Sequence, residues 1–434
     1  MINTHHLFSG YTMIIPLVIG AFLSGIFYLS EGSSIPLTIF QLSLVFSFIL
    51  FFIKKIIERD TSIELYGLEK WYLLFFTIIA FSIIYTPERA QALLYFIRFT
   101  VLISMTYVIY NTVKSERDIV AISIAFILIA TIVASMGIIQ SYLNPENLVL
   151  NYVNQGRNLI RASGVETDPN VYASNFFIPV MLSVTLFLGD ISRKLKVLLF
   201  LSILIFLVAI LLTYSRSAWV SIFLGLLILI FLTKKFNFLI YGAVALVIVL
   251  SSSETMQNFS ISLFNRLLDV FAGTQDDSSN IRILLAKASV LMFFDSYLVG
   301  VGFQGFSTAF QNYYTPQETI GIYEPHNEFY TVYSELGIFG FFIFMIIIVS
   351  IYKRAKNNIN LSYKKNNLRM ISMGLYVSFI CYLIFYQFYG GMFYNSILMI
   401  LIGLIFGVSK LGTERDTVAI LKSPNRNISS NYTS

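Results

Sequence analysis

The chain has 434 residues, of which 57% are hydrophobic and only 12% are charged, and its formal net charge is +6. Because soluble domains carry about 25% charged residues, this composition excludes an ordinary soluble protein and indicates that lipid is the main solvent. The sequence therefore predicts an all-α, polytopic integral membrane protein. Its positive charge then reflects membrane topology, and no nucleic-acid partner is expected.

Apolar segments bounded by charged and turn residues predict about twelve transmembrane helices, in a single transmembrane domain that covers residues 1–434. They lie at 11–29, 35–53, 71–86, 90–110, 118–141, 170–189, 195–212, 216–232, 236–251, 334–352, 368–388 and 392–409. Two connections are long, at 142–169 and 252–333, and the second is expected to contain short helices. The segment 410–434 is expected to be a disordered tail.

Most of the 29 lysines and arginines fall in alternate loops on one side of this topology. Because basic residues are retained on the cytoplasmic side, both termini are predicted to be cytoplasmic and both long loops to face outward. The basic residues that remain on the outer side are Arg89, Arg157, Arg161, Arg216, Arg266, Arg282 and Lys287. They pair with loop acids, or they line a site for an anion.

One arginine, Arg98, is predicted to lie in the middle of the fourth span. An ionisable residue at membrane depth marks a functional position or a buried pair with another helix. The sequence leaves both interpretations open.

The stretch "RASGVETDPN", residues 161–170, contains a helix-start signal. Asp168 is a capping carboxylate, and Pro169 follows at the first helical position. Arg161 is then expected to lie over the outer mouth of the next span. The alternative is an ordinary helix cap with an unrelated arginine.

The stretch "LLTYSRSAWV", residues 211–220, joins two predicted spans through almost no loop. Arg216 is therefore expected at the outer membrane boundary, between two helices. An arginine so placed loses part of its hydration, which is costly unless an anion meets it. A substrate phosphate or a lipid headgroup would serve, and membrane lipids are expected partners in either case.

Residues 281–294 have apolar positions at roughly helical spacing, interrupted by Arg282 and Lys287. This pattern predicts a helix that lies in the membrane interface and does not cross it. The following "GVGFQG", residues 300–305, matches G-x-G-x-x-G, but no strand–turn–helix unit surrounds it. We therefore expect a tight re-entrant turn and no dinucleotide site.

The stretch "EPHNEFYTVYSELG", residues 324–337, holds His326, one of only three histidines. Asn327 is expected to cap a helix that begins here, which places His326 at its N-terminus. The positive end of the helix dipole disfavours imidazolium, so a neutral ring able to accept a proton is expected. The alternative is a histidine that only caps the helix. Glu335, further along the helix, is expected to be a structural hydrogen-bonding residue.

Together these residue types suggest one chemistry. Guanidinium groups bind phosphate oxygens in bidentate fashion, so the outer arginines are expected to hold a diphosphate leaving group. A neutral histidine nearby could take the proton from an attacking hydroxyl. No D-x-D motif and no second outward histidine is present, and the single cysteine, Cys381, lies in an apolar segment. A site without metal or other cofactor is therefore expected.

The segments "RASGVETDPNVYA", "LTYSRSAWV", "NIR" followed by "VGVGFQGF", and "HNEFYTVYSELGIFG" resemble, in order and spacing, signature blocks of the O-antigen ligase and polymerase superfamily. The resemblance runs from about residue 155 to 345. It implies a metal-independent, inverting glycosyltransferase in the bacterial inner membrane that uses undecaprenyl diphosphate-linked glycan at the periplasmic face. It assigns diphosphate binding to Arg161, Arg216 and Arg282, and the base to His326. Arg98, Asn327 and Glu335 are accessory residues.

The acceptor remains open between lipid A–core, for a ligase, and another lipid-linked repeat, for a polymerase. A chain-length regulator is a further candidate partner. The rival class is a lipid-linked glycan flippase or another polysaccharide transporter, which the number of spans also fits. Transporters usually place substrate groups near the membrane midplane and often have two related halves. Here the polar groups gather at one outer region. A non-catalytic scaffold of an envelope assembly complex is a third interpretation.

Overall fold

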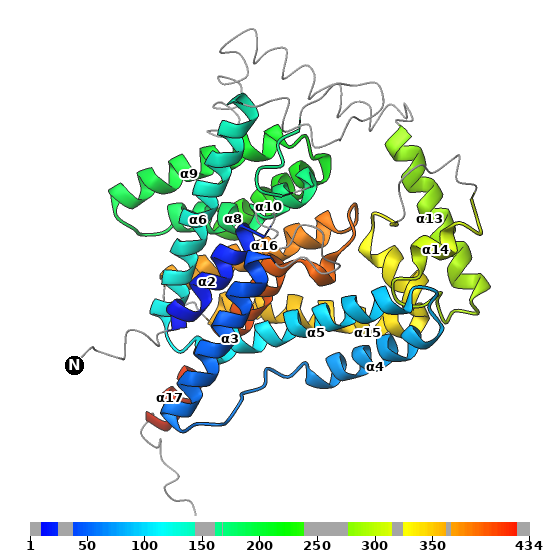
Figure 1. The fold of residues 1–434 in the computed structure, drawn as a ribbon. Helices are drawn as coiled ribbons and strands as arrows, with labels where there is room; N and C mark the ends of the chain where they lie inside the picture. Colours follow the sequence, from blue (N-terminus) through cyan, green and yellow to red (C-terminus); the bar gives the residue numbers. More distant parts are fainter. Residues whose placement is uncertain are drawn as a thin grey trace, which may run out of the picture.

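The structure is a computed structural model that describes residues 10–24, 38–143, 161–166, 168–237, 277–314, 324–361 and 366–422. Within these ranges the side chains of 277–280, 366 and 413–422 are not described. The described part is all-α (Figure 1). Its helices are α2 (Gly10–Phe22), α3 (Ile39–Glu58), α4 (Glu69–Tyr85), α5 (Arg89–Thr112), α6 (Glu116–Leu143), α7 (Pro169–Ser174), α8 (Phe177–Leu188), α9 (Arg193–Leu212), α10 (Arg216–Thr233), α13 (Asp277–Asp295), α14 (Phe306–Phe310), α15 (Glu328–Leu361), α16 (Asn366–Phe385), the 3-10 helix η2 (Met392–Tyr394) and α17 (Ser396–Lys422).

Eight helical segments of the described part are long and apolar enough to cross a membrane. They are Ile39–Glu58, Arg89–Thr112, Glu116–Leu143, Pro169–Leu188, Arg193–Leu212, Arg216–Thr233, Glu328–Leu361 and Asn367–Phe385. Two shorter apolar helices, Gly10–Phe22 and Ser396–Gly412, accompany them. The predicted all-α polytopic fold is confirmed. The predicted span at 236–251 lies almost entirely outside the described residues.

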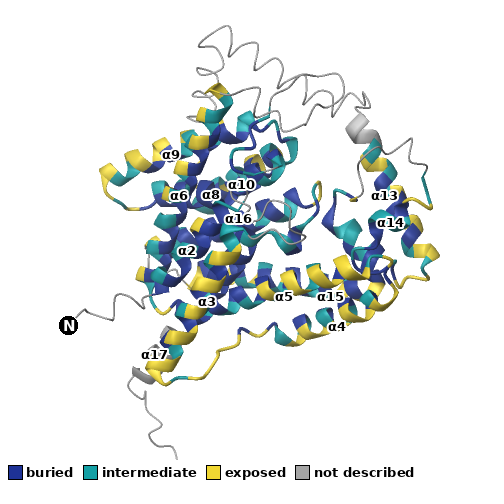
Figure 2. Ribbon diagram, viewed as in Figure 1, coloured by how far each residue is buried: buried dark blue, intermediate teal, exposed yellow. Residues whose placement is uncertain are grey.

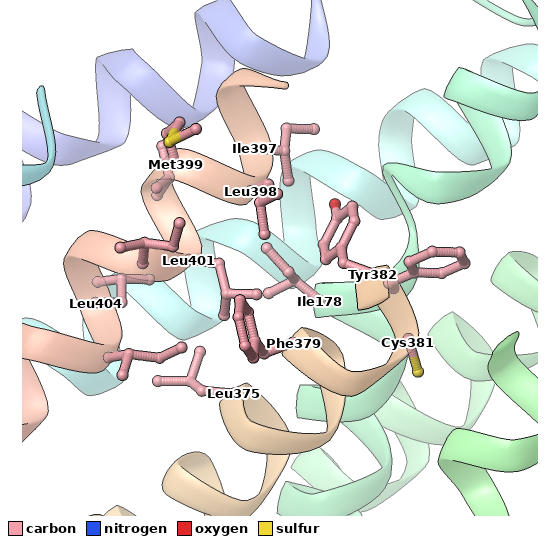
Figure 3. Close-up of a cluster of buried hydrophobic side chains, with 14 of the residues drawn as sticks. Ile178, Leu375, Phe379, Cys381, Tyr382, Ile397, Leu398, Met399, Leu401 and Leu404 are labelled. Carbon is pink, nitrogen blue, oxygen red and sulfur yellow. The ribbon is translucent and has the colours of Figure 1, made fainter. Parts of the chain in front are cut away.

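Two helices form the centre of the bundle. The spans that contain α8 and α16 are 83% and 72% buried, whereas those of α3 and α9 are only 22% and 28% buried. Helix α16 packs against α8, α10, α15 and α17, and Figure 3 shows side chains of α16 and α17 meeting Ile178 of α8. The peripheral helices α3 and α9 carry many exposed residues (Figure 2). Those of α3 include the large apolar side chains Phe46, Phe52 and Ile56. Apolar surface of this extent suits contact with lipid.

Helix α15 is interrupted at Gly337, whose backbone is non-helical with φ 66° and ψ −165°. The sequence predicts one continuous helix here, and that prediction is wrong. The loop Leu298–Gly305 lies against the interruption: the Ile338 amide donates to the Leu298 carbonyl, and the Gly302 amide to the Glu335 carbonyl, both at 2.9 Å. A Cβ on Gly337 would collide with the Leu298 carbonyl oxygen, so glycine is required where the two segments cross.

Two segments that were predicted to lie outside the spans, 252–333 and 410–434, contain helices. Helices α13 and α14 occur within the predicted loop 252–333, and α13 is not among the helices able to span a membrane. Helix α17 continues to Lys422, into the segment 410–434 that the sequence predicts to be a disordered tail; that prediction stays untested. Residues 423–434 lie outside the described residues.

Candidate active site

The start of α15 is fixed to the end of α16, and this positions His326. Asn327 caps α15, as predicted: its Oδ1 accepts from the amides of Phe329 at 2.9 Å and Tyr330 at 3.1 Å. Its Nδ2 donates to the carbonyl of Gln387 at 2.8 Å. These bonds satisfy amides that a helix N-terminus leaves free. Asn327 therefore sets the position of its neighbour.

His326 occupies an unusual backbone conformation, with φ 49°, in the left-handed region that non-glycine residues seldom adopt. Its half-buried ring lies beside Tyr389, with the ring centroids 6.3 Å apart. The Tyr389 hydroxyl donates to Asp168 Oδ2 at 2.9 Å, while Asp168 Oδ1 accepts from the Asn170 amide at 2.6 Å. The predicted Asp168 cap is therefore confirmed. Through Tyr389, the same carboxylate also connects the segment 161–170 to His326.

Arg161 joins the segment 161–170 to the segment 211–220. Its Nε donates to the carbonyl of Thr213 at 2.7 Å, and its Nη2 to Asn170 Oδ1 at 3.1 Å. The amide of Ala162 donates to the carbonyl of Leu212 at 2.9 Å. Two of the donors on the Arg161 guanidinium are thus engaged by the protein. Their effect is to hold the segment that begins at Arg161 against the turn that precedes Arg216.

Arg282, at the beginning of α13, lies within electrostatic range of both Arg216 and His326. The residue is accessible to solvent, yet surrounding protein atoms reduce its hydration. This loss of hydration lowers the pKa of Arg282, and the neighbouring Arg216 lowers it further. Two guanidinium groups beside each other repel, and an anion between them would relieve that repulsion. Arg282 thus lies within electrostatic range of both Arg216 and His326.

Opposing charges act on His326. Burial lowers its pKa most, Arg282 lowers it further, and Asp168 raises it. Since the ordinary value is about 6.5, the imidazole is neutral at pH 7 and can accept a proton. Burial is the largest of these effects, and the sequence could not reveal it.

Two further polar residues belong to this region: Glu324, and Tyr389, which the sequence analysis missed. Glu324 stands two residues before His326, and burial followed by the charge of Asp168 raises its pKa. Burial raises the pKa of Tyr389 as well, so its hydroxyl stays protonated and always donates to Asp168. The only sequence signal for Tyr389 is its place before Gly390 and Gly391, just after a predicted span.

Arg98 does not join the other arginines. It lines a cavity of about 380 Å³ between α5, α15 and the loops at 303–307 and 390–394. Its guanidinium carbon lies 5.7 Å from the centre of the Tyr394 ring. Glu335 lies on the same cavity wall, and its carboxylate accepts from the amides of Gln304 at 2.9 Å and Phe306 at 3.3 Å. Glu335 thus has the structural role expected of it, in fixing the glycine-rich loop.

Within the residues that the structure describes, no group of three or more His, Cys, Asp and Glu side chains is placed to hold a metal ion. The charged groups that act on His326 are Arg282 and Asp168, which are far apart in the sequence.

Comparison with known families identifies part of this assembly. Residues 201–345 match the model of the O-antigen ligase family. The match confirms the resemblance to the O-antigen ligase and polymerase superfamily and supports glycosyltransferase-type chemistry. It includes Arg216, Arg282 and His326, and leaves Arg98 and Arg161 outside. No curated protein matches the chain.

Proposed function

We propose that this O-antigen ligase family protein transfers a glycan from an undecaprenyl diphosphate donor to an acceptor hydroxyl at the periplasmic face of the bacterial inner membrane. The observation that carries the proposal is the neutral His326, which lies within electrostatic range of both Arg282 and Asp168, with Arg216 beside Arg282. Both termini would then be cytoplasmic and the loops at 142–169 and 252–333 periplasmic, as the distribution of basic residues supports.

The arginines would bind the diphosphate of the donor. A guanidinium presents a planar fork of donors that matches two phosphate oxygens and keeps its charge at every physiological pH. Arg216 and Arg282 repel each other in the free protein, so a diphosphate is the natural ligand between them. The same groups would stabilise the negative charge that builds on the diphosphate as it leaves. Arg161 would support them by holding the Thr213 turn, besides contacting the anion.

His326 would act as the general base. The acceptor oxygen bonds to the anomeric carbon of the donor sugar while its proton passes to the imidazole. The bond between that carbon and the phosphate oxygen breaks, and undecaprenyl diphosphate leaves with the electron pair. A single displacement of this kind inverts the anomeric configuration. Asp168 would stabilise the imidazolium that forms, in the manner of the carboxylate of a catalytic triad.

The acceptor would be lipid A–core in a ligase or a second lipid-linked repeat in a polymerase, and each makes a distinct glycan pattern. Deletion of the gene in its own host should leave bare core with polymer on undecaprenyl diphosphate in the first case. In the second it should leave core that carries a single repeat. A flippase, the alternative from another class, would leave single lipid-linked repeats on the cytoplasmic side.

Complementation of that deletion strain tests the catalytic proposal. The variants His326→Ala and Arg282→Ala should insert in the membrane at normal levels yet fail to restore the glycan pattern on a lipopolysaccharide gel. If both variants restore full glycan display, the protein does not use His326 and Arg282 as proposed. A matched control is Lys287→Ala, an exposed cation on the same helix as Arg282, which should restore the wild-type pattern.

A further inference from the structure

The cavity beside Arg98 is built from matching faces of two helices. Gln91, Tyr95 and Arg98 of α5 line one side. These positions, i, i+4 and i+7, share one face of a helix. On the other side, Glu328, Thr331, Val332, Glu335 and Leu336 repeat the same spacing along α15. The cavity volume of about 380 Å³ falls in the range of about 300–1,000 Å³ typical of small-molecule sites.

The cavity wall includes an arginine well inside a helix that is long and apolar enough to cross a membrane. Arg98 is about 14 Å along α5 from the first residue, at 1.5 Å per residue. Among the described residues it makes no ion pair and contacts the ring of Tyr394 instead. A charge within a membrane-spanning helix usually faces a pair or a functional cavity, and in the described structure Arg98 has the cavity. Structural pairing, the other reading of Arg98, is therefore disfavoured.

Aromatic rings and amide groups hold this wall in a fixed shape. Gln304 Nε2 donates to the Tyr394 hydroxyl at 3.1 Å, and Gln304 itself has φ 59°. The rings of Tyr95 and Tyr394 meet edge to face, with centroids 4.7 Å apart. The cavity therefore offers flat apolar surfaces next to fixed hydrogen-bonding groups. A pyranose presents the same combination, with apolar C–H faces and a rim of hydroxyls.

The carboxylates of the wall argue against a phosphate in this cavity. Glu324, Glu328 and Glu335 all line it, against the single guanidinium of Arg98. An ionised lipid headgroup phosphate or a second diphosphate has no hydrogen-bond donor to offer the carboxyl oxygens of this wall. Sugar hydroxyls, in contrast, can donate to Glu324 and accept from Arg98. The chemistry of the lining selects a hydroxyl-rich, largely neutral ligand.

The segment 324–326 connects the cavity to the arginine cluster, by which we mean Arg161, Arg216 and Arg282. Glu324 and Pro325 line the cavity, and the next residue, His326, lies within range of Arg282. None of Arg161, Arg216 and Arg282 lines the cavity. In an inverting displacement the nucleophile approaches from the side opposite the leaving group. His326 does not itself line the cavity, but it directly follows two residues that do.

We propose that this cavity is the subsite for the terminal sugar of the acceptor, which it holds so that one hydroxyl reaches His326. The proposal rests on the glycosyl transfer proposed above. Arg98 and Gln91 would donate to sugar oxygens, Glu324 would accept from a hydroxyl, and the rings of Tyr95 and Tyr394 would cover an apolar face of the sugar.

Two variants address the cavity without touching the proposed donor site. Gly390 lies on its wall, has no backbone strain that requires glycine, and would direct a Cβ to 3.4 Å from Glu324 Oε2. Gly390→Leu should therefore fill the cavity, and Gly390→Ala serves as its matched control. Arg98→Gln removes the charge and keeps a donor. Arg282→Gln alters a residue that does not line the cavity.

The measurement is saturation-transfer difference NMR on the purified full chain, in a detergent without a sugar headgroup, because such a headgroup would compete. The probes are the methyl glycosides of glucose, galactose, N-acetylglucosamine and glucuronic acid. The wild type and Gly390→Ala should transfer saturation to at least one probe. Gly390→Leu should abolish that transfer, Arg98→Gln should weaken probe affinity by about tenfold, equivalent to about 1.4 kcal/mol, and Arg282→Gln should leave it unchanged.

Binding of undecaprenyl diphosphate, measured on the same samples, separates this proposal from that of the reaction. Gly390→Leu and Arg98→Gln should both still bind undecaprenyl diphosphate. Such binding would also show that both variants are folded. If Gly390→Leu does not fold, the probe affinity of Arg98→Gln alone tests the sugar subsite. The sugar subsite is refuted if no probe binds the wild type, if Arg98→Gln binds the probes as the wild type does, or if Arg282→Gln loses them. Activity of His326→Ala would instead refute the reaction.

Discussion

Replacement of Arg282 by glutamine should separate two effects that the arginine has on the site. Arg282 would bind the donor diphosphate, and its charge lowers the pKa of His326. A hydrogen bond to a charged group contributes roughly 1.5–3 kcal/mol. Loss of one such interaction should therefore weaken undecaprenyl diphosphate binding by about 10- to 150-fold.

The second effect has a definite sign on the pH profile. His326 acts as a base only when it is neutral, so the rate rises as pH rises through its pKa. Without the charge of Arg282 the pKa of His326 is higher, and the acid limb of the profile should move to higher pH. Asp168 then dominates the charges around the ring.

The assay is transfer from purified lipid-linked donor in proteoliposomes, with initial rates measured from pH 5 to 9 and donor affinity measured separately. Lys287→Gln removes a charge from an exposed position on the same helix and should leave both quantities unchanged. If Arg282→Gln weakens binding but leaves the acid limb where it was, His326 is not the base whose titration controls the rate. If neither quantity changes, Arg282 does not face the donor.

Asp168→Asn should move the same acid limb to lower pH, because the carboxylate of Asp168 raises the pKa of His326; an unchanged limb would contradict this. Tyr389→Phe should lower the melting temperature slightly, since it loses one hydrogen bond to a charged group, whereas Tyr389→Leu, which also removes the ring beside His326, should lower it more. Glu335→Ala should destabilise the protein by about 1–3 kcal/mol, the cost of buried amides left unpaired, measured by thermal unfolding in detergent. Gly337→Ala should reduce folded yield, because its Cβ would meet the Leu298 carbonyl at a positive φ; normal yield would show that the helix interruption relaxes easily.

Features set by neighbouring residues were predictable from the sequence. Long apolar segments locate the helices, since backbone groups in lipid must be satisfied within a helix. The caps at Asp168 and Asn327 follow from short polar side chains one to three residues before the amides that they accept from. The glycines of 300–305 predicted a tight turn, and Gly300 and Gly302 have positive φ angles.

Features set by distant contacts were not predictable. The interruption at Gly337 depends on a loop more than thirty residues earlier, and one sequence contains no sign of that partner. Asp168 was interpreted as a cap alone, because its bond to Tyr389 spans 221 residues. Arg98, Tyr95 and Gln91 share a helical face, but that face indicates a cavity only when α15 is known to lie opposite. The sequence therefore predicts the separate parts of the site better than their assembly.

The charges around His326 imply an order in which the site becomes competent. In the free protein Arg282 and burial hold the ring neutral, which makes it available as a base but a weak one. A diphosphate bound as proposed would bring negative charge to Arg282 and Arg216 and would offset the effect of Arg282 on the ring. The pKa of His326 then rises, and Asp168 favours the protonated form still more. The imidazole would gain basicity only when a donor occupies the arginines, so a hydroxyl in the acceptor cavity would be deprotonated when there is an anomeric carbon for it to attack.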